Sequence, residues 1–186
     1  MKITIQENEE NQRLGVLVDR ILQSATLDRG ELEIKSEPIL LNELINDVVH
    51  TAELRVKSLN GTIKMELTSE LIEIAGDRFH TTNVLSNLID NAIKYSSNEP
   101  EITVSLQKEN SNIFLSVSDK GIGIKKEHIN KIFDKLYRIP TGNIHNVKGF
   151  GLGLSYVKAI LILQGWNIKV KSTPGQGTEF IVEIKQ

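Results

Sequence analysis

The sequence predicts an α+β fold: a two-layer sandwich in which helices lie on one face of a mixed β-sheet, preceded by an N-terminal helix. The segments 102–106 and 113–117 alternate apolar and polar residues across a short polar turn, which is typical of a β-hairpin. Three longer segments, at 42–58, 77–96 and 152–164, repeat their apolar residues every three or four positions, as amphipathic helices do. Antiparallel hairpins with helices between them indicate the α+β class.

The first predicted element is a helix from about residue 6 to residue 27. Its apolar residues form one narrow stripe: Leu14, Val18, Ile21 and Ala25. Gly30 suits the C-cap of this helix. A narrow stripe fits either a partner helix or the chain's own core, and the sequence favours neither reading.

The other elements are predicted by strand patterns, helix patterns and turn residues. They are, in order, an extended connector at 31–38, the helix 42–58, strands at 62–67 and 71–75, the helix 77–96, the hairpin, a short helix near 125–132, an aperiodic loop at 138–148, the helix 152–164, a strand at 168–171, a turn at 174–177 and a last strand that contains 180–184. We expect Trp166 to pack in the core rather than to stack on a ligand.

The composition excludes several classes of protein. With 39% hydrophobic and 25% charged residues, the 186-residue chain can form one folded core. Its formal net charge of -2 does not suit a surface that binds nucleic acid through phosphates, and the absence of cysteine excludes disulfides and thiolate zinc sites. The longest apolar run, 159–163, is far shorter than the ~20 residues that span a bilayer, and no signal-peptide pattern follows Met1. We therefore expect this part of the protein in the cytosol.

The helix predicted at 77–96 carries a polar stripe beside its apolar one, formed by Asn83, Asn87, Asn91 and Lys94. Asparagine is a poor helix former. Three asparagines on one face therefore indicate that their amide groups are needed, for example as oxygen ligands of Mg²⁺. The alternative is a solvated face, which is the usual reading for polar residues on a helix.

Two glycine-rich segments stand at the junctions of predicted elements. The segment 119–123, DKGIG, follows a strand and precedes a helix, so it fits a tight turn beside a ligand of Asp119 or a plain strand-to-helix turn. The segment 149–154, GFGLGL, opens a helix, where backbone N–H groups can approach an anion, and this favours a phosphate site. It follows a loop rather than a strand and lacks Gly-Lys-Ser/Thr, so neither a dinucleotide motif nor a P-loop is predicted.

Four motifs together resemble those of the ATP-binding catalytic domain of sensor histidine kinases, within the GHKL superfamily. Residues 87–96 (NLIDNAIKYS) are similar to the N box, 119–123 to the first glycine box, 132–138 (IFDKLYR) to the F box and 149–154 to the second glycine box, and 174–180 (PGQGTEF) looks like the closing turn. Four motifs in this order are far more specific than any one of them. The likeness extends from about residue 6 to the end of the chain.

The resemblance implies a Bergerat-type fold that binds ATP and Mg²⁺. Asn91 would hold Mg²⁺ and act in catalysis with Lys94, which reaches the phosphates with Tyr95, and with Arg138, a candidate partner of the γ-phosphate. Asp119 would accept a hydrogen bond from the adenine amino group. The other implied nucleotide contacts are Asn87, Gly121, Gly123, Lys148, Gly149, Gly151, Gly153, Leu154 and Thr178. Residues 139–148 would form a lid, mobile without nucleotide, and the glycines after it a hinge.

The resemblance also implies partners. The domain 37–186 would transfer the γ-phosphate of ATP to a histidine on a dimerisation domain, of which 1–36 would be the end of the second helix and the connector. We expect a homodimeric parent, anchored in the inner membrane through other segments, that passes phosphate to a response regulator. The nucleotide partners that the resemblance implies for this domain are ATP and ADP.

The chain departs from the family pattern in two respects. No histidine lies in a His-Glu/Asp-Leu-Arg/Lys-x-Pro motif, so we expect the acceptor outside the chain and no autophosphorylation by the chain alone. We expect all four histidines, His50, His80, His128 and His145, at the surface or its boundary, and only His145 near the chemistry. In the F box, Leu136 replaces a usual aromatic residue.

Two other functions remain as alternatives. Hydrolysing members of the superfamily carry a glutamate one helical turn before the magnesium asparagine, where it activates water. Here Asn87 occupies that position, and an amide is a poor base, so the kinase reading gains over an ATPase of the GHKL type. An interaction module that binds nucleotide or helices without catalysis is the second alternative, and the intact motifs argue against it.

Overall fold

All the helices and strands described here belong to the second of the two units into which the chain divides, Ile34–Gln186; the first unit is Met1–Glu33. A computed structural model describes residues 29, 32–96, 99–139 and 150–185. The helix expected at 6–27 and most of the expected lid lie outside these residues.

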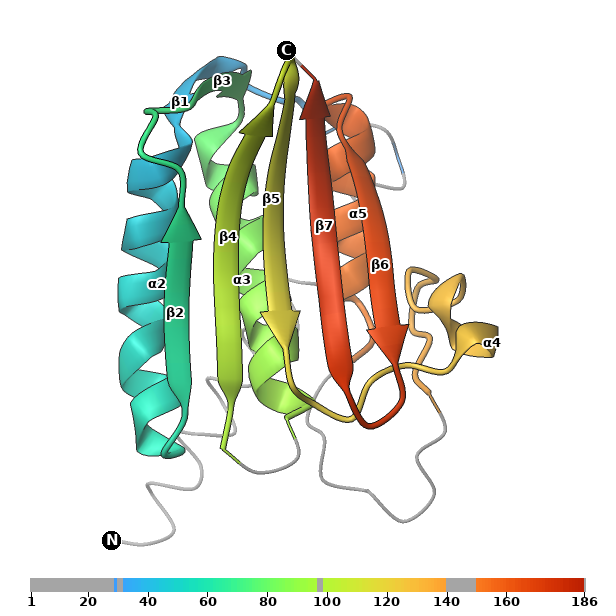
Figure 1. Ribbon diagram of the computed structural model, residues 1–186. Helices are drawn as coiled ribbons and strands as arrows, with labels where there is room; N and C mark the ends of the chain where they lie inside the picture. Colours follow the sequence, from blue (N-terminus) through green and yellow to red (C-terminus); the bar gives the residue numbers. More distant parts are fainter. Residues whose placement is uncertain (1–28, 30–31, 97–98, 140–149, 186) are drawn as a thin grey trace, which may run out of the picture. The chain divides into compact units, whose positions relative to one another are not determined.

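Five strands form the main sheet, in the order β2-β4-β5-β7-β6 (Figure 1). They are β2 (Thr62–Leu67), β4 (Glu101–Glu109), β5 (Asn112–Asp119), β6 (Asn167–Thr173) and β7 (Gly177–Lys185). β2 runs parallel to β4, and the other neighbours are antiparallel. The prediction of a mixed sheet is therefore confirmed.

A second, two-stranded sheet joins the starts of two helices. β1 (Glu37–Leu40) pairs antiparallel with β3 (Glu73–Gly76), and each strand leads directly into a helix. The sequence indicated extended structure near both segments but did not predict that they pair with each other. More than thirty residues separate the partners, and strand patterns report local conformation rather than pairing.

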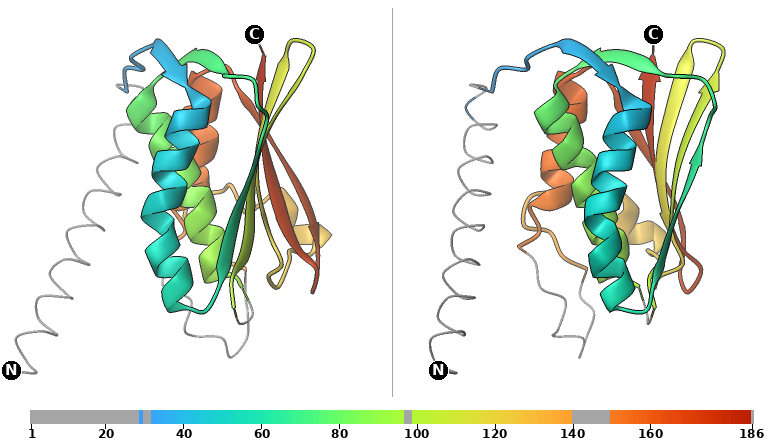
Figure 2. Two further views of the ribbon diagram at one scale, coloured as in Figure 1. Left: turned by 60° about the vertical axis from the view of Figure 1, so that its left-hand side comes forward. Right: turned by 90° about the vertical axis from the view of Figure 1, so that its left-hand side faces the viewer.

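Three helices cover one face of the main sheet (Figure 2). They are α2 (Leu41–Ser58), α3 (Arg78–Lys94) and α5 (Gly153–Leu163), close to the predicted ranges, while α4 (Lys126–Ile129) is a single turn. Their apolar stripes meet the inward side chains of the strands in one core, which includes Leu44, Ile45, Leu85, Leu88, Ile89, Val104, Leu115, Val117, Val157, Ile160 and Val182. The two-layer α+β architecture is confirmed, and Trp166, only 8% exposed, packs in the core as expected.

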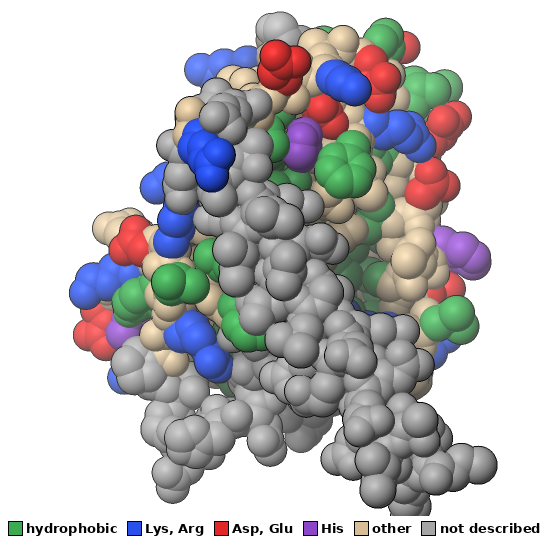
Figure 3. Space-filling view, turned by 180° about the vertical axis from the view of Figure 1, so that it is seen from behind, with side chains coloured by type: hydrophobic (Ala, Val, Ile, Leu, Met, Phe, Trp, Pro, Cys, Tyr) green, Lys and Arg blue, Asp and Glu red, His purple; other side chains and the backbone are tan. Residues whose placement is uncertain are grey.

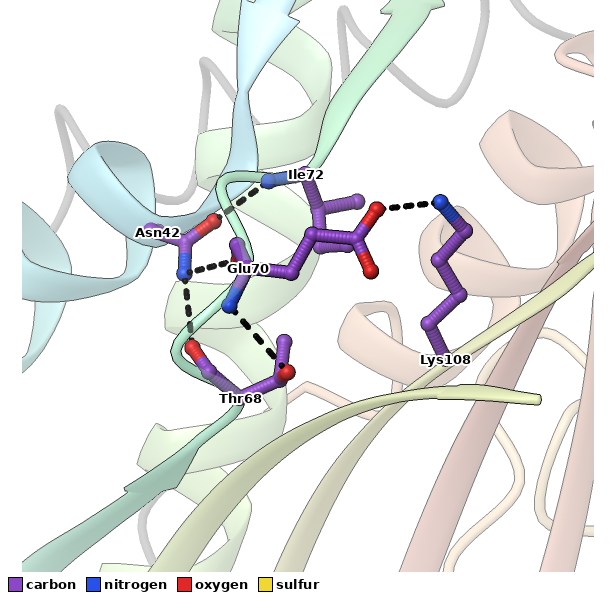
Figure 4. Close-up of polar contacts among 5 residues, drawn as sticks. All are labelled: Asn42, Thr68, Glu70, Ile72 and Lys108. Carbon is purple, nitrogen blue, oxygen red and sulfur yellow. Dashed lines mark hydrogen bonds and ion pairs between the residues drawn. The ribbon is translucent and has the colours of Figure 1, made fainter.

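One buried asparagine fixes the loop that leads from the main sheet to β3. The Asn42 amide nitrogen of α2 donates to the carbonyl oxygens of Thr68 and Glu70, at 3.3 and 3.2 Å, and its oxygen accepts from the Ile72 amide at 2.8 Å (Figure 4). Glu70 also pairs with Lys108 of β4. Each polar atom of this buried amide is satisfied, as folded proteins require.

The outer side of the helix layer is mixed in character. Exposed hydrophobic residues occur on each of the three helices, for example Leu54, Phe79 and Ile162, and the view from behind shows hydrophobic side chains among charged ones (Figure 3). In the described part of the chain, no helix combines the length and hydrophobicity needed to cross a membrane.

Candidate functional site

A cavity of about 270 Å³ opens where five segments meet. These segments are the end of α3, the end of β5 with the loop after it, α4 with the segment after it, the start of α5, and the β6–β7 turn with the start of β7. The β6–β7 turn and the ends of α3 and β5 lie at the lower end of the sheet in Figure 1. The residues that line it are Asn91, Tyr95, Asp119, Ile122, Gly123, Ile124, Lys125, His128, Ile132, Tyr137, Arg138, Ile139, Leu154, Pro174, Thr178 and Phe180. A mostly apolar cavity with a few convergent polar groups is typical of a small-molecule site.

Asp119, the last residue of β5, contributes a half-buried carboxylate to the wall. Burial raises its pKa, and hydrogen bonds from the backbone N–H groups of Gly121 and Thr178 oppose this rise. The Gly121 amide lies 2.8 Å from the Asp119 carboxylate oxygen. A carboxylate that is held partly desolvated in a cavity is a candidate ligand-binding group.

The loop after β5 is fixed between α3 and the β6–β7 turn. The Ile122 amide donates to the Tyr95 carbonyl at 3.0 Å, and the Ile122 carbonyl accepts from the Gly175 amide at 2.8 Å. Gly123 has φ +66°, and a Cβ there would lie 2.1 Å from the Thr173 carbonyl oxygen. At Gly121 a Cβ would lie 2.3 Å from the Tyr95 carbonyl oxygen. The two glycines therefore permit the close approach that shapes this wall.

The asparagine stripe of α3 faces α5 and the cavity rather than open solvent. Asn83, Asn87 and Asn91 are all partly buried. The Asn87 amide donates to the Asn83 carbonyl at 2.8 Å. Among the described residues, the Asn91 amide nitrogen is one of the few buried side-chain polar atoms without a hydrogen-bond partner. An unpaired buried polar group costs about 1–3 kcal/mol, so Asn91 is suited to a partner that arrives with a ligand.

The start of α5 packs closely against α3 and against the segment that resembles the F box. A Cβ at Gly153 would lie 2.8 Å from the Asn87 side-chain oxygen. Gly151 has φ +71°, and its carbonyl accepts from the Leu136 amide at 3.0 Å. Leu136, with φ +61°, is 68% exposed. Further along α5, the Lys158 ammonium lies 5.6 Å from the centre of the ring of Phe133, which belongs to the segment that resembles the F box.

The structure brings together seven of the residues that the sequence singled out. Those that line the cavity are Asn91, Tyr95, Asp119, Gly123, Arg138, Leu154 and Thr178. Asn87, Gly121, Gly151 and Gly153 support its walls, as described above, while Lys94 does not line it. Lys148 and Gly149 lie outside the described residues.

The expectation for the histidines was wrong in two places. His128 lines the cavity, and its Nδ1 lies 2.8 Å from the Tyr137 hydroxyl, so it is near the chemistry. His80 is only 8% exposed and lies in the interior between α3 and α5. Histidine has no fixed preference for the interior or the surface, and neither partner, Tyr156 or Tyr137, is indicated by the sequence pattern around the histidine.

Sequence reasoning also missed most of the apolar lining. Its members are Ile122, Ile124, Ile132, Ile139, Pro174 and Phe180. Several lie inside the recognised motifs, so their position in the sequence was a usable signal. The motifs were interpreted through their polar residues and glycines instead.

Comparison with known proteins identifies the family. Residues 76–186, more than half of the chain, match the model described as "Histidine kinase-, DNA gyrase B-, and HSP90-like ATPase". The chain belongs to this family. This agrees with the cavity, since its walls are built by the segments that resemble the N box and the glycine boxes.

Individual relatives show which kind of protein within this family the chain resembles. The chain is 41% identical to the sensor protein RprX of Bacteroides fragilis over 179 residues, which are 95% of this chain and 34% of RprX. It is 32% identical to the sensor protein kinase WalK of Staphylococcus haemolyticus, covering 95% of this chain and 29% of WalK. The chain thus spans about a third of the length of these relatives. The chain is a catalytic ATP-binding domain of the sensor histidine kinase type.

Solved structures also support a catalytic domain of the histidine kinase type. The catalytic domain of histidine kinase ThkA, in a nucleotide-free form, is 28% identical, with a TM-score of 0.70 over 81% of this chain and 95% of that domain. Full-length ShkA in complex with AMPPNP matches with a TM-score of 0.84 over 94% of this chain and 36% of that protein. At 24% identity, the second likeness shows the fold alone.

Proposed function

We propose that this chain binds Mg²⁺–ATP in the cavity and presents the γ-phosphate to a histidine on a dimerisation domain of the same parent protein. A nitrogen of that imidazole would attack the γ-phosphorus, the bond to the bridging oxygen would break, ADP would leave, and the imidazole would lose its N–H proton to solvent. The observation that carries the proposal is the convergence of Asn91, Asp119 and Thr178 on one cavity in a member of the histidine kinase family.

The adenine end of the proposed site is built by β5 and the loop after it. The Asp119 carboxylate would accept a hydrogen bond from the adenine amino group, beside the buried Thr178. Gly121 and Gly123 keep the loop close to the Tyr95 and Thr173 carbonyl groups, so the ring can lie against Ile122. The partial desolvation that raises the pKa of Asp119 also strengthens its hydrogen bond to a ligand.

The phosphate end is built by α3 and α5. Asn91 would be the protein's own ligand of Mg²⁺, since a hard cation prefers oxygen ligands and keeps several waters and phosphate oxygens. The metal, when bound, neutralises phosphate charge. We further propose that Lys94, Tyr95, Arg138, Lys148 and the glycines at 149, 151 and 153 contact the phosphates, with Asn87 and Leu154 beside them. Phosphoryl transfer needs mainly such positioning and charge neutralisation.

A transferase is favoured over an ATPase by the environment of Asn87. Its amide donates to the Asn83 carbonyl, so the side chain is oriented by α3 itself and has no basic group to offer a water molecule. A water attacking the γ-phosphorus would therefore lack a general base at this position.

The parent's architecture is also a proposal. Residues 1–36 would be the end of a dimerisation helix with its connector, and 37–186 the catalytic domain. The parent would be a homodimer anchored in the inner membrane by segments outside this chain, with this domain in the cytoplasm. A response regulator would receive the phosphate; a likeness to ThkA in complex with the response regulator TrrA, at 25% identity and a TM-score of 0.73, supports this partner.

Phosphoryl transfer can be tested with γ-labelled ATP and Mg²⁺. The chain is incubated alone and then with the histidine-bearing dimerisation domain of its parent. We expect acid-labile label on the added domain and none on this chain. Rapid release of inorganic phosphate by the chain alone, abolished by Asn91→Ala, would favour an ATPase instead.

A further inference from the structure

A buried polar cluster joins the first turns of α3 to α5. The Nδ1 atom of His80 lies 2.8 Å from the Tyr156 hydroxyl, and the Asn83 side chain is near enough to this hydroxyl to lower its pKa. His80 and Tyr156 are each 8% exposed. We call these three residues the α3–α5 cluster. None of them lines the cavity.

The hydroxyl of Tyr156 contributes directional hydrogen bonding rather than packing volume. A phenylalanine would fill the same space, but only a hydroxyl can form polar contacts, and these contacts constrain the positions of His80 and Asn83. Burial raises the pKa of Tyr156 to about 12, so the hydroxyl stays protonated and can donate to one partner while it accepts from the other. A satisfied polar network in a low-polarity interior favours one packing arrangement over shifted ones.

The cluster continues into the walls of the cavity along both helices. On α3, Asn83 is followed one turn later by Asn87, which bonds back to its carbonyl, and after another turn by Asn91. On α5, Tyr156 stands one turn after Gly153, which leaves room for the Asn87 side chain. The register of α5 against α3 therefore sets how Asn91 and Leu154, which both line the cavity, face each other.

The opposite end of α5 is also tied to α3. The Asp77 amide donates to the Gln164 side-chain oxygen at 2.7 Å, just after α5 ends, and the Asp77 carboxylate accepts from the His80 amide at 3.0 Å. Polar contacts thus hold the start of α3 against α5 at two levels, at Tyr156 near the start of α5 and at Gln164 just after its end. The adenine end of the cavity has no such contact with α5, because Asp119 and Gly123 belong to β5 and its following loop, which is tied to the end of α3 and to the β6–β7 turn.

We propose that the α3–α5 cluster is a positioning device: it sets the register of α5 against α3 and so strengthens binding at the phosphate and metal end of the cavity. The inference rests on the proposed nucleotide site. The three residues touch neither nucleotide nor metal, and they act through Asn87, Asn91 and the start of α5.

The test compares two probes in the full 186-residue chain and in Tyr156→Phe. Calorimetry gives the Kd of Mg²⁺–ATP, and NMR shifts of the Gly121 and Gly123 amides give the Kd of adenosine. We expect Tyr156→Phe to raise the Kd of Mg²⁺–ATP by about five- to tenfold and the Kd of adenosine by less than about twofold, as loss of one or two hydrogen bonds allows. Ile113→Val, a core change at the far end of β5, controls for loss of stability alone and should leave both values unchanged.

A second pair of variants tests the histidine. His80→Leu removes the partner of the hydroxyl and should match Tyr156→Phe, with no further loss in the double variant because the two residues act as one unit. His80→Asn places an amide atom near the former Nδ1 and should restore part of the affinity.

The outcomes separate this inference from the proposed function. If the unmodified chain binds no Mg²⁺–ATP, both fail. If it binds normally but Tyr156→Phe and His80→Leu bind as tightly, or lose adenosine equally, the positioning role is overturned while the nucleotide site stands.

Discussion

Single residues of the site are held in states that cost the empty domain stability. Asp119 is a carboxylate whose pKa burial has raised, and Asn91 has a buried amide nitrogen without a partner among the described residues. Groups that weaken the empty fold are expected where a ligand will complete their hydrogen bonds. The Asp119 carboxylate therefore fits the proposed contact with adenine, and the unpaired Asn91 Nδ2 suits a phosphate oxygen as acceptor, while the Asn91 Oδ1 is the atom that would hold Mg²⁺.

The clearest residue-scale prediction concerns the adenine acceptor. Asp119→Ala should weaken nucleotide binding by about 1–3 kcal/mol, because the adenine amino group would be buried without its partner. Calorimetry with ADP measures this. Asp47→Ala, at an exposed position of α2, is the control and should bind as the unmodified chain does. Unchanged affinity in the Asp119 variant would remove this residue from the site.

A second residue-scale prediction follows from His80. Burial lowers its pKa in the folded state, partly opposed by the nearby Asp77 charge, so the unfolded chain binds the proton more readily. The contribution of neutral His80 is therefore fully present above the unfolded pKa of about 6.5 and is lost as the pH falls below it. Urea unfolding between about pH 5 and 7.5 should show a steeper loss in the unmodified chain than in His80→Asn. The exposed control His50→Gln should keep the steep slope, and equal slopes in all three would contradict the account.

At the scale of elements, the site depends on contacts between loops that only glycine allows. Gly123 and Gly175 both have positive φ, at +66° and +76°. A Cβ at Gly123 would meet the Thr173 carbonyl oxygen at 2.1 Å, whereas a Cβ at Gly175 would meet nothing within 4 Å. A side chain would strain the backbone at both positions, but only at Gly123 would its Cβ also collide with a neighbouring residue.

This difference allows Gly123→Ala to be compared with Gly175→Ala as a matched control. Gly175→Ala should destabilise the fold by about 1–2 kcal/mol, the cost of a left-handed backbone with a Cβ. Gly123→Ala should destabilise it by clearly more and should also weaken nucleotide binding, since the loop must move away from Thr173. Urea unfolding and calorimetry measure both quantities. Equal effects in the two variants would show that close packing at Gly123 does not shape the cavity.

The elements were largely predictable because their patterns are local. Apolar residues every three or four positions predicted α2, α3 and α5, and alternation predicted β4 and β5. The β1–β3 pairing was not predictable, since a strand pattern does not name its partner. His80 and His128 were misplaced for the same reason: their partners, Tyr156 and Tyr137, come from other elements or from turns without periodicity.

At the scale of the whole molecule, the site exists only because distant segments meet. The pairing of β5 with β7 places Asp119 opposite Thr178, far apart in the sequence. The order β2-β4-β5-β7-β6 could not be derived from periodicity, because only β4–β5 and β6–β7 are hairpins of neighbouring strands. The motifs singled out Asn91, Asp119 and Arg138 of the cavity lining but neither Lys125 nor His128. A family's motifs carry spatial information that a single pattern lacks.

The central claim is that this cavity binds ATP through Mg²⁺ held by Asn91. The most direct measurement is calorimetry of ATP with the full chain, with and without Mg²⁺, repeated with Asn91→Ala and with the control Asn46→Ala on the exposed side of α2. The account predicts that Mg²⁺ tightens ATP binding in the unmodified chain and in Asn46→Ala, and that this gain is lost in Asn91→Ala. No ATP binding by the unmodified chain, or the same gain from Mg²⁺ in Asn91→Ala, would contradict it.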